Sequence, residues 1–141
     1  MTFFIDANVL VYSAASHTPR GRTCASILHA VAADDAPGRI STAALEEVWD
    51  LERRSRVPGL KGLTERAYDA LAPLLPVTDQ VFVLARELQG ARAGTNDRLH
   101  LACCIVNGIE TIVSNDRGLD GPHGVRRVDP TDHDAVAALL S

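Results

Sequence analysis

Two acidic residues of this chain follow short runs of apolar, β-prone residues. Asp6 comes directly after the run at residues 3–5, and Asp116 ends a segment that begins with the run at residues 111–113. We expect both runs to be buried strands, because aromatic and β-branched residues favour strands. In an open α/β sheet, ligands bind in the crevice at the carboxyl ends of the strands. Both carboxylates are therefore expected in that crevice.

Further acids stand near predicted helix starts. Asp97 opens one expected helix, and Glu46 and Glu47 lie early in another. Several carboxylates in one crevice repel each other, and a divalent cation is the natural compensation. The pattern therefore predicts a Mg²⁺ site in which Mn²⁺ can substitute. Asn8 adds a second polar side chain at the same strand end as Asp6.

Each acid also has a purely structural interpretation. Asp6 and Asp97 could be helix N-caps, since aspartate is a favoured capping residue. Asp116 could be an ordinary turn residue, and either glutamate could be a solvated helix charge. Because four acids fall near expected strand ends or helix starts, we favour one shared site.

Periodicity leaves open which of two neighbouring glutamates faces the crevice. At about 100° per residue, Leu45, Val48 and Trp49 share one helix face. Glu46 borders that face, and Glu47 lies nearly opposite it.

Two other polar residues near these acids receive structural interpretations. His100 follows Asp97 by three residues and lies on the same helix face, within reach of Asp97 or of a substrate. We favour a hydrogen-bonded structural histidine over a metal ligand. Asp120, close after Asp116, is interpreted as a solvated loop acid.

The elements expected to position these residues alternate between strands and helices. Strands are predicted at 2–6, 39–41 and 111–114, with a weak edge strand at 125–128. Helices are predicted at 7–15, 22–33, 42–56 (capped by Thr42), 63–75, 79–89 (capped by Asp79), 97–106 and 132–140, with a break at 90–94. This alternation indicates an α/β fold with a mostly parallel central sheet covered on both faces. The 141 residues are expected to form a single domain, 1–141.

Composition excludes several classes of protein. The net charge of −4 argues against a strongly basic nucleic-acid binder, although not against a nuclease whose acids are neutralised by metal. Cys24, Cys103 and Cys104 lack disulfide or zinc spacing and are expected to be buried apolar residues. No apolar run is long enough for a membrane span, and the first residues do not resemble a signal peptide. We therefore expect a cytoplasmic protein.

Four segments of the chain, in order, resemble the PIN-domain family, and more narrowly VapC-type toxin ribonucleases of type II toxin–antitoxin systems. The segments are Ile5–Leu10, Ile40–Glu47, Asn96–Ala102 and Ile112–Asp116. The resemblance implies a PIN-like three-layer α/β/α fold. It also implies that four acids are both catalytic and metal-binding: Asp6, Glu47, Asp97 and Asp116.

The family pattern selects Glu47 over Glu46, because its glutamate comes two residues after the leucine. Ser114 stands where the family usually has threonine or serine, and is a supporting residue together with Asn8. Many members carry a further Asp and a Phe after the last acid, where this chain has Gly118 and Leu119.

The resemblance also implies a function. It predicts a homodimeric Mg²⁺-dependent or Mn²⁺-dependent endoribonuclease that cleaves single-stranded or looped RNA and is inhibited by a cognate VapB-like antitoxin. Arg98 or Arg117 would contact phosphates. The alternative is a catalytically weak PIN-like module that binds RNA or a protein partner. Two other α/β classes fit poorly. A phospho-accepting signalling domain needs a lysine at a late strand end, and Lys61 is elsewhere; a haloacid dehalogenase-type phosphatase needs Asp in place of Asn8.

Overall fold

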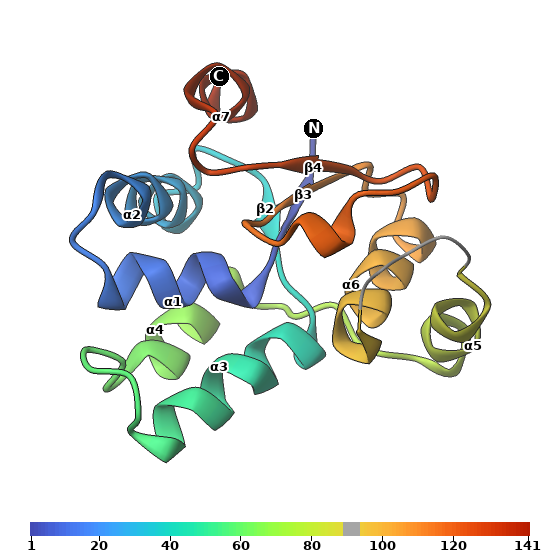
Figure 1. Cartoon of the computed structure of the whole chain (residues 1–141), viewed down its shortest axis with the longest axis horizontal. Helices are drawn as coiled ribbons and strands as arrows, with labels where there is room; N and C mark the ends of the chain where they lie inside the picture. Colours follow the sequence, from blue (N-terminus) through green and yellow to red (C-terminus); the bar gives the residue numbers. More distant parts are fainter. Residues whose placement is uncertain (89–93) are drawn as a thin grey trace.

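The computed structural model describes residues 1–88 and 94–141 and is built around a four-stranded sheet (Figure 1). The strand order is β2-β1-β3-β4, and every pairing is parallel. The strands are β1 (Phe3–Ile5), β2 (Gly38–Arg39), β3 (Thr111–Val113) and β4 (Arg126–Val128). The mostly parallel central sheet predicted from the sequence is confirmed, and the segment at 125–128 is indeed an edge strand.

Helices lie on both sides of this sheet. In Figure 1, α1 and α2 lie on one side of the strands and α5 and α6 on the other, which confirms the three-layer α/β/α fold. The helices, with one short 3₁₀ turn, are α1 (Ala7–Ala15), α2 (Pro19–Ala32), α3 (Thr42–Arg54), α4 (Leu63–Leu71), α5 (Asp79–Glu87), α6 (Thr95–Val106), η1 (Arg117–Leu119) and α7 (His133–Leu140). No helix within the described ranges is long and apolar enough to cross a membrane.

The strand register places two polar residues side by side. Ile5 of β1 lies opposite Val113 of β3, and Val113 lies opposite Val128 of β4. The backbone amide of Asp6 donates to the carbonyl of Val113 at 3.0 Å. Asp6 and Ser114 directly follow the paired residues, so both emerge at the carboxyl edge of the sheet.

The central strands are buried because helices cover both of their faces. Phe3, Phe4 and Ile5 are fully buried, and so are Ile112 and Val113. This matches the continuous apolar runs expected of a parallel sheet covered on both sides. The buried strands give the residues at their carboxyl ends a rigid base.

The cysteines belong to the same core. Cys24, Cys103 and Cys104 are free thiols with no exposed surface, as expected. Burial raises the pKa of Cys24 to about 11, so this thiol stays protonated and behaves as a small apolar group.

Helix α4 is shorter than predicted. It ends at Leu71 rather than Leu75, because a residue before proline is disfavoured in helical geometry and Ala72 precedes Pro73. Leu75 is instead extended and forms a β-bridge. Leu71 and Leu75 are buried in the core of this chain, and the half-buried Leu74 packs against that core.

Several other helix starts differ from the prediction. Helix α2 begins at Pro19, because proline fits the first helical position and the Thr18 side chain caps it. Ser41 caps α3 and Thr78 caps α5, each one residue before the predicted cap. Helix α6 begins at Thr95, two residues early. The predicted end of α5 at residue 89 and most of the break at 90–94 lie outside the described residues.

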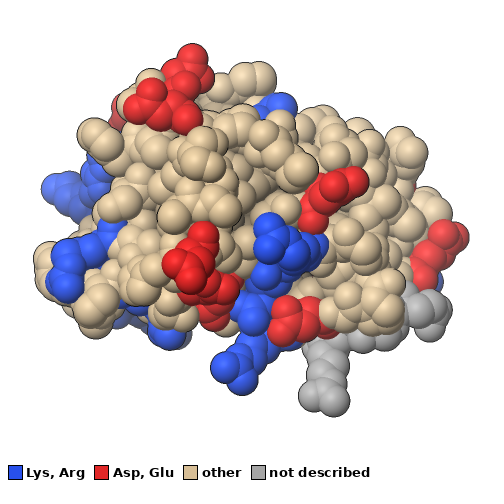
Figure 2. Space-filling model, turned by 90° about the horizontal axis from the view of Figure 1, so that it is seen from above, with Lys and Arg blue, Asp and Glu red and all other residues tan. Residues whose placement is uncertain are grey.

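Charges of both signs are spread over the surface. On the face shown in Figure 2, Lys and Arg side chains lie beside Asp and Glu side chains on a mostly uncharged surface. That mixture agrees with the small net charge of −4 and indicates no general attraction to polyanions on this face.

Candidate metal centre

Asp6 is almost completely buried and is fixed through both of its carboxylate oxygens. Oδ1 accepts from the backbone amide of Ala7 at 2.7 Å, which makes Asp6 the N-cap of α1. Oδ2 accepts from the Ser114 hydroxyl at 2.6 Å and from Asn8 Nδ2 at 3.1 Å. Burial raises the pKa of Asp6, although the charge on His100 and the Ser114 hydrogen bond oppose the rise. The cap interpretation of Asp6 is therefore confirmed, and its carboxylate also lies at the carboxyl edge of the sheet beside Ser114.

Ser114 connects the ends of two strands. Besides donating to Asp6, its buried hydroxyl oxygen accepts from Asn8 Nδ2 at 3.1 Å and from the backbone amide of Asp116 at 3.0 Å. Asn8 also accepts from the amide of Asn115 through Oδ1 at 3.4 Å. Asn8 and Ser114 thus hold the acid at the end of β1 and the loop after β3 in one hydrogen-bonded group.

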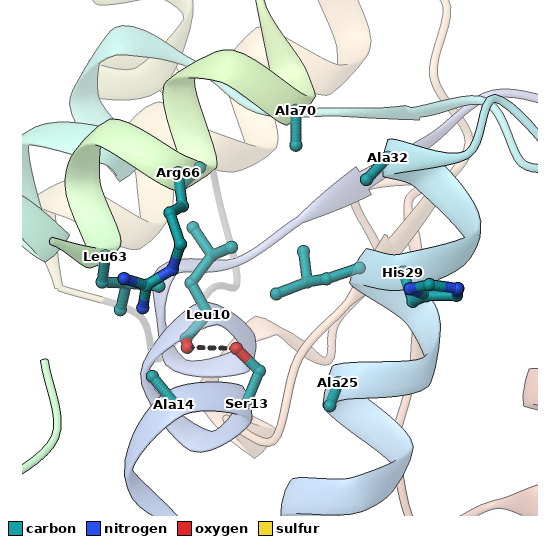
Figure 3. A pocket seen from close by; sticks show the side chains of 11 residues that line it. Leu10, Ser13, Ala14, Ala25, His29, Ala32, Leu63, Arg66 and Ala70 are labelled. Carbon is teal, nitrogen blue, oxygen red and sulfur yellow. Dashed lines mark hydrogen bonds between the residues drawn. The ribbon is translucent and has the colours of Figure 1, made fainter.

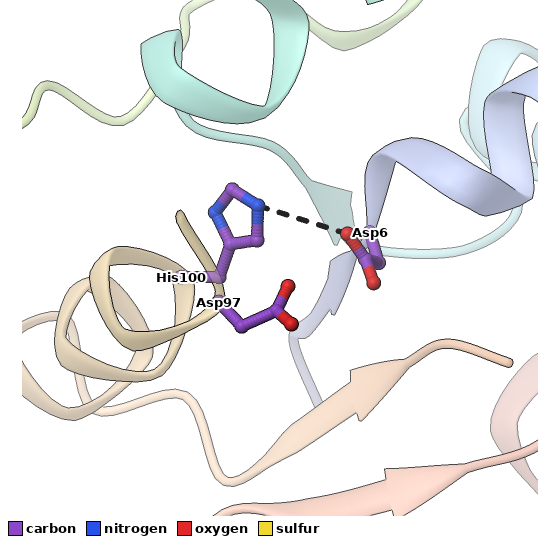
Figure 4. Close-up of side chains that lie close together, drawn as sticks. All are labelled: Asp6, Asp97 and His100. Carbon is purple, nitrogen blue, oxygen red and sulfur yellow. Dashed lines mark ion pairs between the residues drawn. The ribbon is translucent and has the colours of Figure 1, made fainter. Parts of the chain in front are cut away.

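Asp97 reaches the same place from α6. It lies in the first turn of the helix after the cap residue Gly94, so the N-cap interpretation is wrong. Figure 4 shows its carboxylate pointing into the space between His100 and Asp6. Burial raises the pKa of Asp97 to about 7, and a hydrogen bond with Asp116 and the charges of Asp6 and Asp116 add to the rise. The raised pKa thus reflects first the burial of the carboxylate and then the negative charges beside it.

Asp116 approaches Asp97 from the loop after β3. It is exposed, and its Oδ1 accepts from the amide of Gly118 at 2.8 Å, which caps the short η1 turn. A Cβ added at Gly118 would lie 3.0 Å from this oxygen, so glycine leaves room for the carboxylate. The turn interpretation of Asp116 is correct as local structure, and its carboxylate also contacts Asp97.

His100 is a fully buried imidazole beneath these acids. Its Nε2 lies 2.7 Å from Glu47 Oε1 and 3.7 Å from Asp6 Oδ1, and its ring packs against Phe4 with centroids 5.5 Å apart. Burial disfavours the charged imidazolium, but the hydrogen bond to Glu47 and the charges of Asp6 and Glu47 outweigh it and raise the pKa of His100. Since a carboxylate only accepts, Nε2 carries a proton.

The two neighbouring glutamates of α3 have different surroundings. Glu47 is partly buried and bonded to His100, whereas Glu46 is exposed. Trp49 is 53% exposed, so it does not share the buried face of Leu45 and Val48 as periodicity suggested. The structure therefore directs Glu47 toward the acids and leaves Glu46 in solvent.

Three side chains with possible ligand atoms lie close together within the described ranges. Asp6, Asp97 and His100 each offer one ligand atom, and these atoms lie within 4.8 Å of one another (Figure 4). Asp116 and Glu47 lie at the border of this group, one bonded to Asp97 and the other to His100. The carboxylate oxygens match the hard ligands that Mg²⁺ and Mn²⁺ prefer.

Comparison with protein-family models assigns the chain to a family. The PIN domain model matches residues 3–122, which contain all the acids described above. The chain belongs to the PIN domain family. Comparison with curated proteins found no match.

Two solved structures share the fold of this PIN domain. VapBC2 from Rickettsia felis, crystallised with a DNA fragment from its promoter, is 16% identical with a TM-score of 0.67, covering 92% of this chain and 98% of that chain. PAE2754 from Pyrobaculum aerophilum is 17% identical with a TM-score of 0.56, covering 98% and 99%.

The PIN domain also carries a largely apolar groove between α1, α2 and α4. Its volume is about 350 Å³, and Figure 3 shows side chains from all three helices lining it. Leu10, Leu28 and Ala67 contribute apolar surface, whereas Arg66 and His29 supply polar groups. Helix α1 is capped by Asp6, so the groove and the acidic group share one element.

Sequence patterns missed the contribution of His100 to this site. The i, i+3 spacing from Asp97 showed that both side chains share a helix face. The spacing did not show that His100 would reach Glu47, which is 53 residues away in the sequence. The burial of His100 and its hydrogen bond to Glu47 agree with the interpretation as a structural histidine. His100 also lies next to Asp6 and Asp97, so it forms part of their surroundings.

Proposed function

We propose that this PIN domain is a metal-dependent endoribonuclease, the VapC-like toxin of a toxin–antitoxin pair. One observation carries the proposal: the carboxylates of Asp6 and Asp97 converge in the crevice at the strand ends, and the pKa of Asp97 is raised to about 7. Uncompensated carboxylates destabilise a fold unless a cation or a proton neutralises them. A metal ion that replaces the proton at neutral pH would neutralise these carboxylates and would explain why the fold brings them together.

The donor set fits Mg²⁺ or Mn²⁺. Asp6, Asp97 and Asp116 would hold the ion, with Glu47 as a further ligand or as a base. Such an ion lowers the pKa of bound water and stabilises negative charge on a phosphate. His100 contributes no ligand through Nε2, because that nitrogen donates its proton to Glu47.

The side chains of the chain itself would orient the reactants. Asp6 accepts hydrogen bonds from Ser114 and Asn8, which orient its carboxylate before substrate binds. Glu47 uses Oε1 for His100, and its Oε2 has no hydrogen-bond partner within the described part of the chain. That oxygen is placed to accept a proton from an attacking water. Arg117 is exposed beside Asp116 and would contact a phosphate.

RNA is the substrate class that we propose. Scissile phosphates of single-stranded or looped RNA are accessible to a crevice at a sheet edge, whereas a regular helix is harder to reach. The net charge of −4 gives no general affinity for polyanions. Affinity for RNA must therefore come from local contacts near the bound metal ion. Such contacts favour RNA in which the scissile phosphate lies in an exposed loop.

A VapB-like antitoxin is the protein partner that we propose. The structure from Rickettsia felis is of a VapBC pair, and this chain shares the fold of its match in that structure. The groove between α1, α2 and α4 would receive an apolar helix of the partner, with Arg66 pairing an acidic residue. The C-terminal segment of the partner would then reach the acidic crevice from the start of α1.

A second copy of the chain is a further proposed partner. Phe82 and Val83 on α5 are 54% and 52% exposed, and Trp49 on α3 is 53% exposed. Large exposed apolar side chains are characteristic of interfaces between subunits. We propose that these two helices form the homodimer contact.

Cleavage of total tRNA and ribosomal RNA tests the proposed function. Purified, partner-free protein is incubated with Mn²⁺, with Mg²⁺ or with EDTA, beside Asp6→Asn, Glu47→Gln and the matched control Glu46→Gln. The proposal predicts discrete fragments that need metal, disappear in the first two variants and persist in the control. If folded protein with either metal cleaves none of these RNAs, the ribonuclease proposal fails for them and a PIN-like binding module is favoured.

A further inference from the structure

Arg127 of β4 makes an unusually complete set of contacts. Its guanidinium donates to Asp120 through Nε at 2.8 Å and Nη2 at 3.3 Å, which is a bidentate pair. Nη1 donates to the backbone carbonyl of Ser114 at 3.0 Å and to Asp129 Oδ2 at 3.1 Å. The Arg127 side chain is only 11% exposed, whereas its partner Asp120 is 55% exposed, so the bidentate pair lies at the surface and the contacts to Ser114 and Asp129 are partly buried. A bidentate guanidinium–carboxylate pair is more directional than an ordinary surface ion pair.

The contacts of Arg127 bracket the loop that carries Asp116. Ser114 lies at the start of the loop and Asp120 directly follows η1 at its end. Between them, the fully buried side chain of Leu119 anchors η1 in the core. Asp116 therefore sits in the segment 114–120, which is fixed at both ends and at one internal point.

The pair also corrects one expectation from the sequence. Asp120 was interpreted as a solvated loop acid, and its side chain is indeed 55% exposed. Its carboxylate is nevertheless bound to Arg127, and the hydrogen bond from Arg127 lowers the pKa of Asp120 below its ordinary value. Asp120 thus remains charged at neutral pH and serves as the attachment point of the loop.

We propose that Arg127 is a positioning residue of the metal centre, which sets the location of Asp116 relative to Asp97 by holding Ser114 and Asp120 together. The inference rests on the proposed function, because it assumes that Asp116 helps to bind the metal. Arg127 touches none of the acids assigned to the metal. It acts through the loop, and also through Ser114, whose hydroxyl bonds both Asp6 and the amide of Asp116.

Lysine cannot replace Arg127 in this role. The planar guanidinium satisfies a carboxylate, a backbone carbonyl and a second carboxylate at fixed angles, whereas an ammonium is a single point of charge. Arg127→Lys keeps the charge and loses the fork, and Arg127→Gln loses both. Asp120→Asn keeps the shape of the loop acid and removes its charge. These variants separate electrostatic attraction from geometric positioning.

The test measures Mn²⁺ binding by isothermal titration calorimetry together with kcat and KM for RNA cleavage. We expect the Kd for Mn²⁺ to rise about 10-fold in Arg127→Gln and in Asp120→Asn, as for other residues that orient metal ligands. Arg127→Lys should lie between wild type and Arg127→Gln. We expect kcat to fall while KM for RNA stays unchanged. The control is Arg126→Gln, which removes an exposed arginine from the same strand, and its Kd should equal that of wild type.

Urea unfolding separates positioning from loss of fold. Asp120 is on the surface, so Asp120→Asn is expected to keep a near wild-type midpoint while its Kd rises. A folded Asp120→Asn and a folded Arg127→Lys that both bind Mn²⁺ with the wild-type Kd would overturn the positioning role while leaving the proposed function intact. Wild-type protein that neither binds Mn²⁺ nor cleaves RNA would overturn both.

Discussion

His100 Nε2 lies 2.7 Å from Glu47 Oε1, and this contact joins α6 to α3 beneath the acidic crevice. The imidazole has no exposed surface, and its Nδ1 has no hydrogen-bond partner within the described residues. The ring is held by this contact to Glu47 and by its packing against Phe4, and its Nε2 also lies 3.7 Å from Asp6 Oδ1. His100 therefore fixes the direction of the one candidate acid that comes from α3.

Replacing His100 should leave the Glu47 carboxylate in the chain but without the hydrogen bond that orients it. We expect His100→Phe, which retains an aromatic ring beside Phe4, to lower kcat for RNA cleavage about 10–100-fold. His100→Gln keeps a donor and should recover part of the loss. Steady-state kinetics on a cleaved RNA measures both variants, with circular dichroism to establish folding. A folded His100→Phe with wild-type kcat would show that Glu47 needs no orientation by His100.

The metal-free protein should lose stability as pH rises through neutrality. The pKa of Asp97 is about 7 in the folded chain against an ordinary value of 3.8. Between these two pKa values, the folded state therefore binds more protons than the unfolded state. The stabilisation that protonated Asp97 contributes is fully present below pH 3.8 and is lost as the pH rises through about 7. In EDTA, the decrease in Tm from pH 5.5 to pH 8 should be larger for wild type than for Asp97→Asn.

Added Mn²⁺ should reverse this trend in the wild type. The ion binds the charged carboxylate and stabilises the folded state by mass action. We expect a larger Mn²⁺-induced rise in Tm at pH 8 than at pH 5.5. Equal pH dependence in wild type and Asp97→Asn would mean that Asp97 does not titrate near neutrality.

Local sequence patterns predicted the sheet and the position of Asp6 and Ser114 at its carboxyl edge. The runs that became β1 and β3 are β-prone and, apart from Thr111, apolar, which is the pattern of strands covered on both faces. Asp6 and Ser114 follow those runs, so their place at the carboxyl edge came directly from strand position. Helix ends were less accurate, since Leu75 continued the apolar pattern of α4 although the chain turns at Pro73.

Local sequence patterns could not predict contacts between segments that are distant in the sequence. Nothing local to His100 indicates Glu47, and nothing local to Asp120 indicates Arg127, because both pairs depend on how whole elements pack. The choice between Glu46 and Glu47 also depended on the rotation of α3 against α6. Periodicity describes which residues share a face, and only packing determines what that face contacts.

Glu52 should stabilise the connection between α3 and α4. Its carboxylate accepts from the backbone amides of Gly62 and Thr64, each at 2.9 Å, and the hydrogen bonds with Thr64 lower the pKa of Glu52. The charged form is thus favoured in the folded state, so its contribution is present above pH 4.5 and lost as pH falls through the lowered pKa.

We accordingly expect Glu52→Gln to lower Tm at pH 7 by a few degrees, because the backbone amides of Gly62 and Thr64 lose a charged acceptor. The difference from wild type should shrink in acid. Differential scanning fluorimetry from pH 3.5 to 7 measures it, with the exposed Glu46→Gln on the same helix as control. A Tm difference that is constant across this range would mean that the charge on Glu52 is not what stabilises the turn.

The exposed apolar residues of α5 should control assembly. Phe82→Asp and Val83→Asp place a charge on the proposed homodimer contact, and burying an unpaired charge is strongly unfavourable. We expect wild type to elute as a dimer in size-exclusion chromatography with light scattering, and both variants as monomers. Tyr68→Asp, at a 52% exposed site on α4, is the matched control. Dimers that persist in both α5 variants would move the interface elsewhere.

Calorimetric titration of Mn²⁺ into wild type, Asp97→Asn and Glu46→Gln tests most directly whether the converging carboxylates form a metal site. The two variants each remove one negative charge, one inside the crevice and one in solvent. We predict that wild type and Glu46→Gln bind Mn²⁺ with the same Kd, and that Asp97→Asn binds at least about 10-fold more weakly. Equal binding by folded Asp97→Asn, or none by wild type, would contradict the metal centre described above.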